Sequence, residues 1–275
     1  MGCHVSIRRG YLECARRALG MGAGAFQFFP KNPRSLTIKN YDPSDAAKCA
    51  AFCREHQLAS VTHAPYPTNL AIKEPELLDL IIRSLQNDLA ITNACGSIGL
   101  VVHFGKSKSS DPLEGYRDIL DCLNRVLLDS EGESLVLLEN QAGEGSTMGT
   151  TLHELVQIRS LADKPEKIGF CFDTCHAYGS GLWKKGKWAE LERLGTELDY
   201  WRHVKVVHFN DSVYPSGSFK DRHAQVGSGL IGLEQMSQVI RSAQLSANPF
   251  ILETAEGVDG THKEEMALLR KLAIQ

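Results

Sequence analysis

An aspartate and a histidine stand three residues apart directly after a short apolar run. The run at positions 169–172 reads GFCF and ends in Asp173, and His176 follows in the next turn. A carboxylate and an imidazole placed in this way can face a common cavity, and both are good zinc ligands. A histidine beside a strand is more often a hydrogen-bonded structural residue, so this pair predicts little on its own.

Other strand-like runs end in the same kinds of residue. Five further runs end in His63, His103, Glu139, His208 and Glu253, and the loop after the seventh run carries Asp221 and His223. If the strand ends face one basin, these residues converge there. We therefore predict nine metal ligands: His63, His103, Glu139, Asp173, His176, His208, Asp221, His223 and Glu253.

Four of the nine predicted ligands are carboxylates, and desolvating them together without cations costs several kcal/mol per charge. A zinc ion takes about four ligands, so nine ligands would hold about three ions if one carboxylate bridges two of them. Imidazole and carboxylate ligands favour zinc, with manganese as the alternative, over calcium or magnesium. Cys175 is interpreted as structural. Clustered divalent ions favour phosphoryl chemistry.

The positions of these residues imply a (β/α)8 barrel. A β-branched or aromatic run is followed eight times by an amphipathic stretch, and this alternation is typical of a TIM barrel whose active site lies at the C-terminal face of the strands. No glycine-rich phosphate loop follows the first run, which argues against a doubly wound sheet. The predicted strands are 3–6, 25–29, 60–63, 99–103, 135–139, 169–173, 204–208 and 250–253, and the predicted helices are 12–21, 44–56, 74–94, 113–128, 151–161, 188–198, 233–243 and 263–272.

Composition places the chain among soluble globular proteins. Its 275 residues are 43% hydrophobic and 23% charged, without an apolar run of the length that a membrane span needs. No linker interrupts the alternation, so we expect a single domain over 1–275. The eight cysteines are too few for a disulfide scaffold and favour a reducing, cytoplasmic setting. The net charge of −3 does not by itself indicate a nucleic-acid binder.

Several segments together resemble the endonuclease IV family of zinc-dependent apurinic/apyrimidinic endonucleases of DNA repair. The most specific are GFCFDTCH at 169–176 and HFNDS at 208–212, the latter followed by DRH at 221–223. The segments ENQAGEG at 139–145, LET at 252–254 and GCHVS at 2–6 are also similar to family segments. The resemblance runs over nearly the whole chain.

The resemblance implies a division of the ligands among three zinc ions. His63, His103 and Glu139 would hold the first ion, with Glu139 bridging to a second that Asp173, His208 and Glu253 also hold. The third would lie among His176, Asp221 and His223. The implied reaction is hydrolysis of the phosphodiester bond 5′ to an abasic site in double-stranded DNA, leaving 3′-hydroxyl and 5′-deoxyribose-phosphate ends, and removal of 3′-blocking groups. Glu139 would be the catalytic residue that orients the attacking hydroxide, and the third zinc would stabilise the leaving 3′ oxygen.

Two positions depart from the family pattern. Pro67, after Tyr66, replaces a leucine expected to wedge into the base stack, and Val213 replaces a lysine. Ten lysines and arginines fall in loops after strands, where they would surround the same mouth. From these and from the resemblance we predict that Lys31, Arg34, Tyr66 and Arg222 contact DNA. Trp183 is a further candidate for stacking on a base, with core packing as the alternative.

A second function fits part of the ligand set. Barrels of the xylose-isomerase type use one divalent ion for sugar isomerisation or epimerisation, and Glu139, Asp173, His208 and Glu253 would suit such a site. His63, His103, His176, Asp221 and His223 would then have no purpose. A non-enzymatic metal-storing barrel would leave an open site of three ions unexplained. His4 is a candidate for supporting the ligands from behind. We expect a monomer that has no membrane partner.

Overall fold

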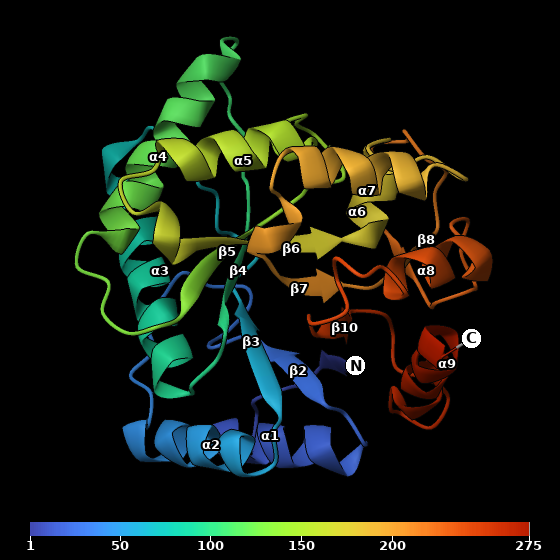
Figure 1. Cartoon of the computed structure of the whole chain (residues 1–275). Coiled ribbons are helices and arrows are strands. Elements are labelled where there is room, and N and C mark those ends of the chain that lie inside the picture. Colours follow the sequence, from blue (N-terminus) through green and yellow to red (C-terminus); the bar gives the residue numbers. More distant parts are fainter. Residues whose placement is uncertain (275) are drawn as a thin grey trace.

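Eight parallel strands close into a barrel in this computed structural model, which describes residues 1–274 (Figure 1). The strands are β1 (Gly2–His4), β2 (Ala25–Phe28), β3 (Ala59–His63), β4 (Gly99–His103), β5 (Leu135–Glu139), β6 (Ile168–Asp173), β7 (Val204–His208) and β10 (Phe250–Leu252). They pair in chain order, and β10 closes the ring by pairing with both β7 and β1. The predicted (β/α)8 fold is confirmed, with strand bounds that differ by up to two residues.

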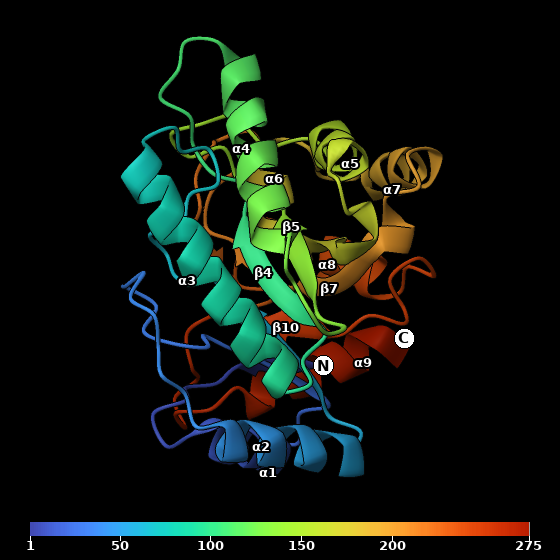
Figure 2. The ribbon, with the colours of Figure 1, turned by 90° about the vertical axis from the view of Figure 1, so that its left-hand side faces the viewer.

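Helices surround the strands, as Figures 1 and 2 show from two sides. Those that follow the strands are α1 (Tyr11–Gly20), α2 (Pro43–Glu55), α3 (Pro75–Ala94), α4 (Pro112–Leu127), α5 (Leu152–Leu161), α7 (Trp188–Glu197), α8 (Leu233–Ile240) and α9 (Lys263–Ile274). In Figure 2, α3 and α4 lie side by side outside β4. Among residues 1–274, no helix is long and apolar enough to cross a membrane.

The local sequence accounts for where the helices begin. Asp42 accepts hydrogen bonds from the Ser44 and Asp45 amides at the start of α2, and a proline occupies the first turn. Thr151 and Glu154 form a reciprocal capping box at the start of α5. Both caps have a sequence signature, DPSD at 42–45 and TLHE at 151–154.

Short elements at both ends of the barrel were not predicted, and those at the mouth shape the site. The short helix α6 (Thr174–Gly179) begins directly after β6, without an intervening loop. Two short antiparallel strands, β8 (Asp211–Ser212) and β9 (His223–Ala224), form a hairpin beyond β7. Single 3-10 turns, η1 (Pro165–Lys167) and η2 (Trp201–His203), lie before β6 and β7 at the opposite end.

The barrel interior contains a layer of small and aliphatic side chains, one from each of seven strands. These residues are buried and form a cluster separate from the larger core between strands and helices: Ala25, Val61, Val101, Leu137, Cys171, Val206 and Ile251. In a strand, the residue two positions further on points to the same face. The residues two positions after these seven therefore form the next interior layer, on the side of the mouth.

Candidate metal centre

The next layer of the barrel is made almost entirely of potential ligands. Two residues beyond the interior cluster, the chain places Gln27, His63, His103, Glu139, Asp173, His208 and Glu253. His4 of β1 pairs in register with Gln27 of β2, so the eighth strand also carries an imidazole at this level. Strand alternation alone thus brings six of the nine predicted ligands into one basin.

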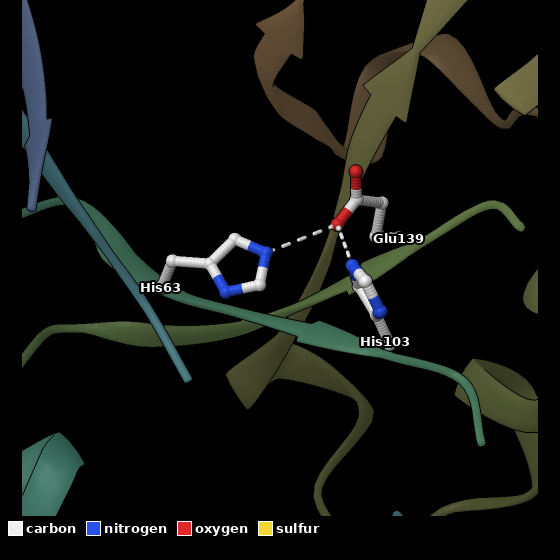
Figure 3. Close-up of side chains that lie close together, drawn as sticks. All are labelled: His63, His103 and Glu139. Atoms are coloured by element: carbon white, nitrogen blue, oxygen red, sulfur yellow. Dashed lines mark ion pairs between the residues drawn. The ribbon is translucent and has the colours of Figure 1, made fainter. Parts of the chain in front are cut away.

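The first group joins three neighbouring strands. The Oε2 atom of Glu139 lies 3.2 Å from His103 Nε2 and 3.4 Å from His63 Nε2. Figure 3 shows both imidazole rings directed at this carboxylate. The other ring nitrogen of His63 lies 2.7 Å from the Ala64 carbonyl oxygen, which fixes the orientation of the ring. These three side chains form a group whose donor atoms all lie within 4.8 Å of one another.

The second group shares Glu139 with the first. His208 Nδ1 lies 2.8 Å from Glu139 Oε1, 3.0 Å from Glu253 Oε2 and 3.9 Å from Asp173 Oδ2. All four side chains offer donor atoms within 4.8 Å of one another. Because one oxygen of Glu139 faces each group, this carboxylate is placed to bridge two ions.

The third group depends on the two unpredicted elements at the mouth. Asp173 accepts a hydrogen bond from the His176 amide over 2.6 Å as the cap of α6, so His176 lies one turn above the strand end. Pairing of His223 with Ser212 places the β9 strand over the same position. His176 Nε2 then lies 3.2 Å from Asp221 Oδ2, and His223 Nε2 lies 3.4 Å from Asp221 Oδ1.

Three buried atoms in these groups have no hydrogen-bond partner among the described residues: Glu139 Oε2, His176 Nε2 and His223 Nε2. Each of these atoms has an ion-pair contact but no hydrogen bond, whereas buried polar atoms in native proteins are almost always hydrogen-bonded. All three can donate a lone pair to a cation, and they face the first and third groups. The residues present therefore fit divalent metal ions.

Charge pairing shifts the pKa values of the site's carboxyl and imidazole groups. Burial alone would raise the pKa of Glu139, but His208 and His103 hold it well below the usual range. Burial would lower the pKa of His176, but Asp173 and Asp221 raise it well above the usual range. Burial raises the pKa of Asp173. A protonated His176 would compensate the charge of Asp173 and Asp221, and metal binding would displace that proton.

Amide side chains support the ligands, and their role was not predicted from the sequence. Gln27 Nε2 donates to Glu253 Oε1 over 2.6 Å, and its Oε1 lies 2.7 Å from His208 Nε2. Asn210 Nδ2 donates to Asp173 Oδ2 over 2.8 Å, and its Oδ1 accepts a hydrogen bond from the Glu253 amide over 2.9 Å. Two signals were available: a glutamine within the otherwise apolar strand AFQF, and an asparagine within the segment HFNDS at 208–212.

The predicted DNA-contact residues divide into two kinds. Arg34, Tyr66 and Arg222 are exposed, and Tyr66 lines the cavity of about 360 Å³ that also contains His63, His103, His176 and Glu253. The prediction that Lys31 contacts DNA is wrong, because its side chain is buried and pairs with Asp88. Trp183 is also fully buried, so its role is core packing.

A closed eight-stranded barrel with clustered histidines and carboxylates at its C-terminal mouth defines a metal-binding barrel of the xylose-isomerase type. The family described as "Xylose isomerase-like TIM barrel" matches residues 15–272. A "Probable endonuclease 4" of Symbiobacterium thermophilum is 40% identical over 272 residues, 99% of each chain. Another from Akkermansia muciniphila is 33% identical over 278 residues, 98% of each chain.

Solved structures agree with these relatives. The crystal structure of endonuclease IV from Thermus thermophilus superposes with a TM-score of 0.87 at 30% identity, covering 98% of this chain and 97% of that one. A D-tagatose 3-epimerase-like protein shares the fold at 17% identity with a TM-score of 0.71, covering 99% of this chain and 98% of that one. The chain belongs to the endonuclease IV family.

Proposed function

We propose that this protein is a DNA-repair endonuclease that hydrolyses the phosphodiester bond 5′ to abasic sites in duplex DNA with three zinc ions. The products would be a 3′-hydroxyl and a 5′-deoxyribose phosphate, and the same site would remove 3′-blocking groups. Family membership supports the reaction. The observation that carries the proposal is the set of three ligand groups joined through Glu139 and Asp173.

The ligand groups suit a phosphodiester more than a sugar. Glu139, Asp173, His208 and Glu253 would be enough for one ion, as in the isomerase alternative. The structure adds the groups His63–His103–Glu139 and His176–Asp221–His223 beside them, and a single-ion site has no use for these. This surplus favours hydrolysis over isomerisation.

When bound, zinc would stabilise charge on the phosphoryl oxygens and the departing 3′ oxygen and would lower the pKa of water in the site. Glu139 would hold the attacking water in line by accepting a hydrogen bond at the centre of the layer. His176, Asp221 and His223 would fix the leaving-group side of the scissile bond. Arg34, Tyr66 and Arg222, exposed around the same mouth, would contact the DNA.

Metal content and incision together test the proposal. We expect about three zinc per chain by elemental analysis, and incision of an abasic duplex at the 5′ side of the lesion. Ketose turnover with one manganese or magnesium per chain would establish the isomerase instead. Resistance to brief chelation is expected, because buried zinc exchanges slowly.

The remaining expectations concern the state of the protein in the cell. We propose a monomer in the cytoplasm, where its eight free and buried cysteines stay reduced. Sedimentation of the zinc-loaded protein at micromolar concentration would show a species of 30.3 kDa.

A further inference from the structure

A buried ion pair fastens the loop after β2 to helix α3. Lys31 Nζ lies 3.1 Å from Asp88 Oδ1, and the two side chains are 2% and 0% exposed. The same ammonium donates to Ser84 Oγ over 2.7 Å and to the Ser84 carbonyl oxygen over 3.0 Å. Neither Asp88 oxygen accepts a hydrogen bond within the described chain, so Lys31 is its compensating partner.

Stability alone does not explain this pair. A buried ion pair seldom stabilises a fold more than well-packed apolar side chains of the same size, because both charges lose their hydration. The pair instead fixes a position. Three contacts from the Lys31 ammonium to Ser84 and Asp88 determine where residue 31 lies along α3. Lys31 stands three residues before Arg34, which is exposed at the mouth.

The other end of the same segment is fastened to the same turn of α3. The Lys39 amide donates to Asn87 Oδ1 over 2.8 Å, and Asn87 Nδ2 donates to the Lys39 carbonyl oxygen over 3.1 Å. Ser84, Asn87 and Asp88 thus hold both ends of segment 31–39.

A third contact ties this segment to the neighbouring loop. The Tyr66 amide donates to the Pro33 carbonyl oxygen over 2.8 Å, so Arg34 and Tyr66 are held in a fixed relation. Arg34 also lines a groove of about 810 Å³ with Arg8 and Lys39, next to His4 and Phe29 of the metal cavity. The fastened segment therefore presents a cation beside the metal centre.

We propose that Lys31, Asn87 and Asp88 are positioning residues that hold Arg34 in place for abasic DNA; this inference rests on the proposed function. The Lys31 and Asp88 side chains are buried against each other, so they act on Arg34 through the backbone. They fix the backbone from which Arg34 projects, so that its guanidinium is ordered before DNA arrives. Pre-ordering of this kind lowers the cost of binding without changing the chemistry at the metal centre.

The experiment compares a DNA substrate with a small one. The double variant Lys31→Met/Asp88→Leu removes both buried charges, and Asn87→Ala releases the other end while keeping the ion pair. We expect KM for an abasic duplex to rise about tenfold in the double variant and about threefold in Asn87→Ala, with kcat and zinc content unchanged. Hydrolysis of bis(p-nitrophenyl) phosphate, which needs the metal centre and not the loop, should stay at the wild-type rate.

Arg34→Ala shows whether the effect acts through Arg34. In the wild-type background it should raise KM about tenfold, and in the double-variant background by less than about twofold, because residues acting as one unit are not additive. Arg202→Met is the matched control, because it breaks an exposed ion pair with Asp199 at the opposite end of the barrel. It should change neither KM for the abasic duplex nor the rate of bis(p-nitrophenyl) phosphate hydrolysis.

Each other outcome decides the question. Equal losses on both substrates, or an undiminished effect of Arg34→Ala in the double variant, would show that the pair is merely structural. A wild-type KM in both loop variants would overturn the positioning role alone. If the double variant does not fold, Asn87→Ala decides by the same criteria. Wild-type protein that leaves abasic duplex intact would overturn the proposed function, and this inference with it.

Discussion

Asn140 pairs with the backbone of Asp173 on the neighbouring strand in both directions. Its Nδ2 donates to the Asp173 carbonyl oxygen over 3.0 Å, and its Oδ1 accepts a hydrogen bond from the Asp173 amide over 2.8 Å. The side chain thereby continues the β5–β6 ladder past the end of β5. The Asn140 carbonyl oxygen also lies 2.9 Å from His176 Nδ1, so one residue orients a ligand in the second group and one in the third.

Asn140→Ala should weaken metal binding without unfolding the barrel. Residues that orient metal ligands are typically worth about 10–100-fold in affinity, and we expect that loss for the ions held by Asp173 and His176. Competition with a zinc-binding dye measures it. Asn248→Ala, before β10 at the other end of the barrel, is the control. Unchanged zinc affinity in the Asn140 variant would contradict the role described for it.

His176→Ala should remove one zinc and most of the cleavage activity. Its Nε2 faces Asp221 in the third group, whereas the first group contains neither residue. Elemental analysis should therefore fall from about three ions to about two per chain. Loss of all the ions would show that the division into groups is wrong.

Arg34→Ala should weaken binding to abasic duplex by about tenfold and leave zinc content intact, because the side chain lies outside the ligand groups. Fluorescence anisotropy with abasic and intact duplexes over a salt series separates two modes of contact. A loss confined to the abasic duplex indicates insertion at the lesion. A loss shared by both, with a shallower salt dependence, indicates a phosphate contact. Loss of zinc would contradict the assignment to DNA.

His4 should make the fold sensitive to acid. Burial lowers the pKa of His4 from 6.5 to about 4, so between these values the unfolded chain takes up a proton that the folded chain does not. The contribution of His4 to the free energy of unfolding is therefore fully present above about pH 6.5 and is lost as the pH falls toward 4. The loss amounts to at most about 3 kcal/mol. Urea unfolding of wild type and His4→Gln at pH 7 and pH 5 should show a smaller loss in the variant. Equal losses would refute this.

The cysteines should be unreactive in the folded protein. All eight are free and buried, and burial raises the pKa of Cys3, Cys122, Cys171 and Cys175 to about 12. A thiolate is the reactive species, so a thiol-specific dye should label less than about one cysteine per folded chain at pH 8. The count should rise to eight after denaturation. Rapid labelling of folded protein would show that a cysteine opens to solvent.

Strand-end residues made the ligand set predictable from sequence. Parallel strands of a barrel all end at one face, so histidines and carboxylates at the strand ends lie close together there. The short helix α6 and the β8–β9 hairpin were not predicted, because six-residue and two-residue elements carry almost no periodic signal. Loop position placed Asp221 and His223 near the mouth without showing what holds them.

Lys31 shows the limit of arguments from loop position. A lysine between a strand and a helix has the same sequence signal whether it points to solvent or back into the protein. The informative residue was distant: Asp88 lies on the buried face of α3 with Ser84, Leu85 and Ile91. A carboxylate on an apolar helix face requires a partner. Asp88 therefore predicts that some cation is buried beside α3, but it does not show which lysine or arginine this is.

The hydrogen bond between Gln27 and Glu253 joins residues 226 positions apart and so has a consequence for biosynthesis. The strand β10, which precedes Glu253, also fills the gap between β7 and β1. A nascent or truncated chain that ends before β10 therefore has an open sheet and an incomplete second ligand group. Since synthesis proceeds from the N-terminus, metal loading of that group has to wait until the final strand is made. Incomplete products of translation would therefore lack a complete metal centre.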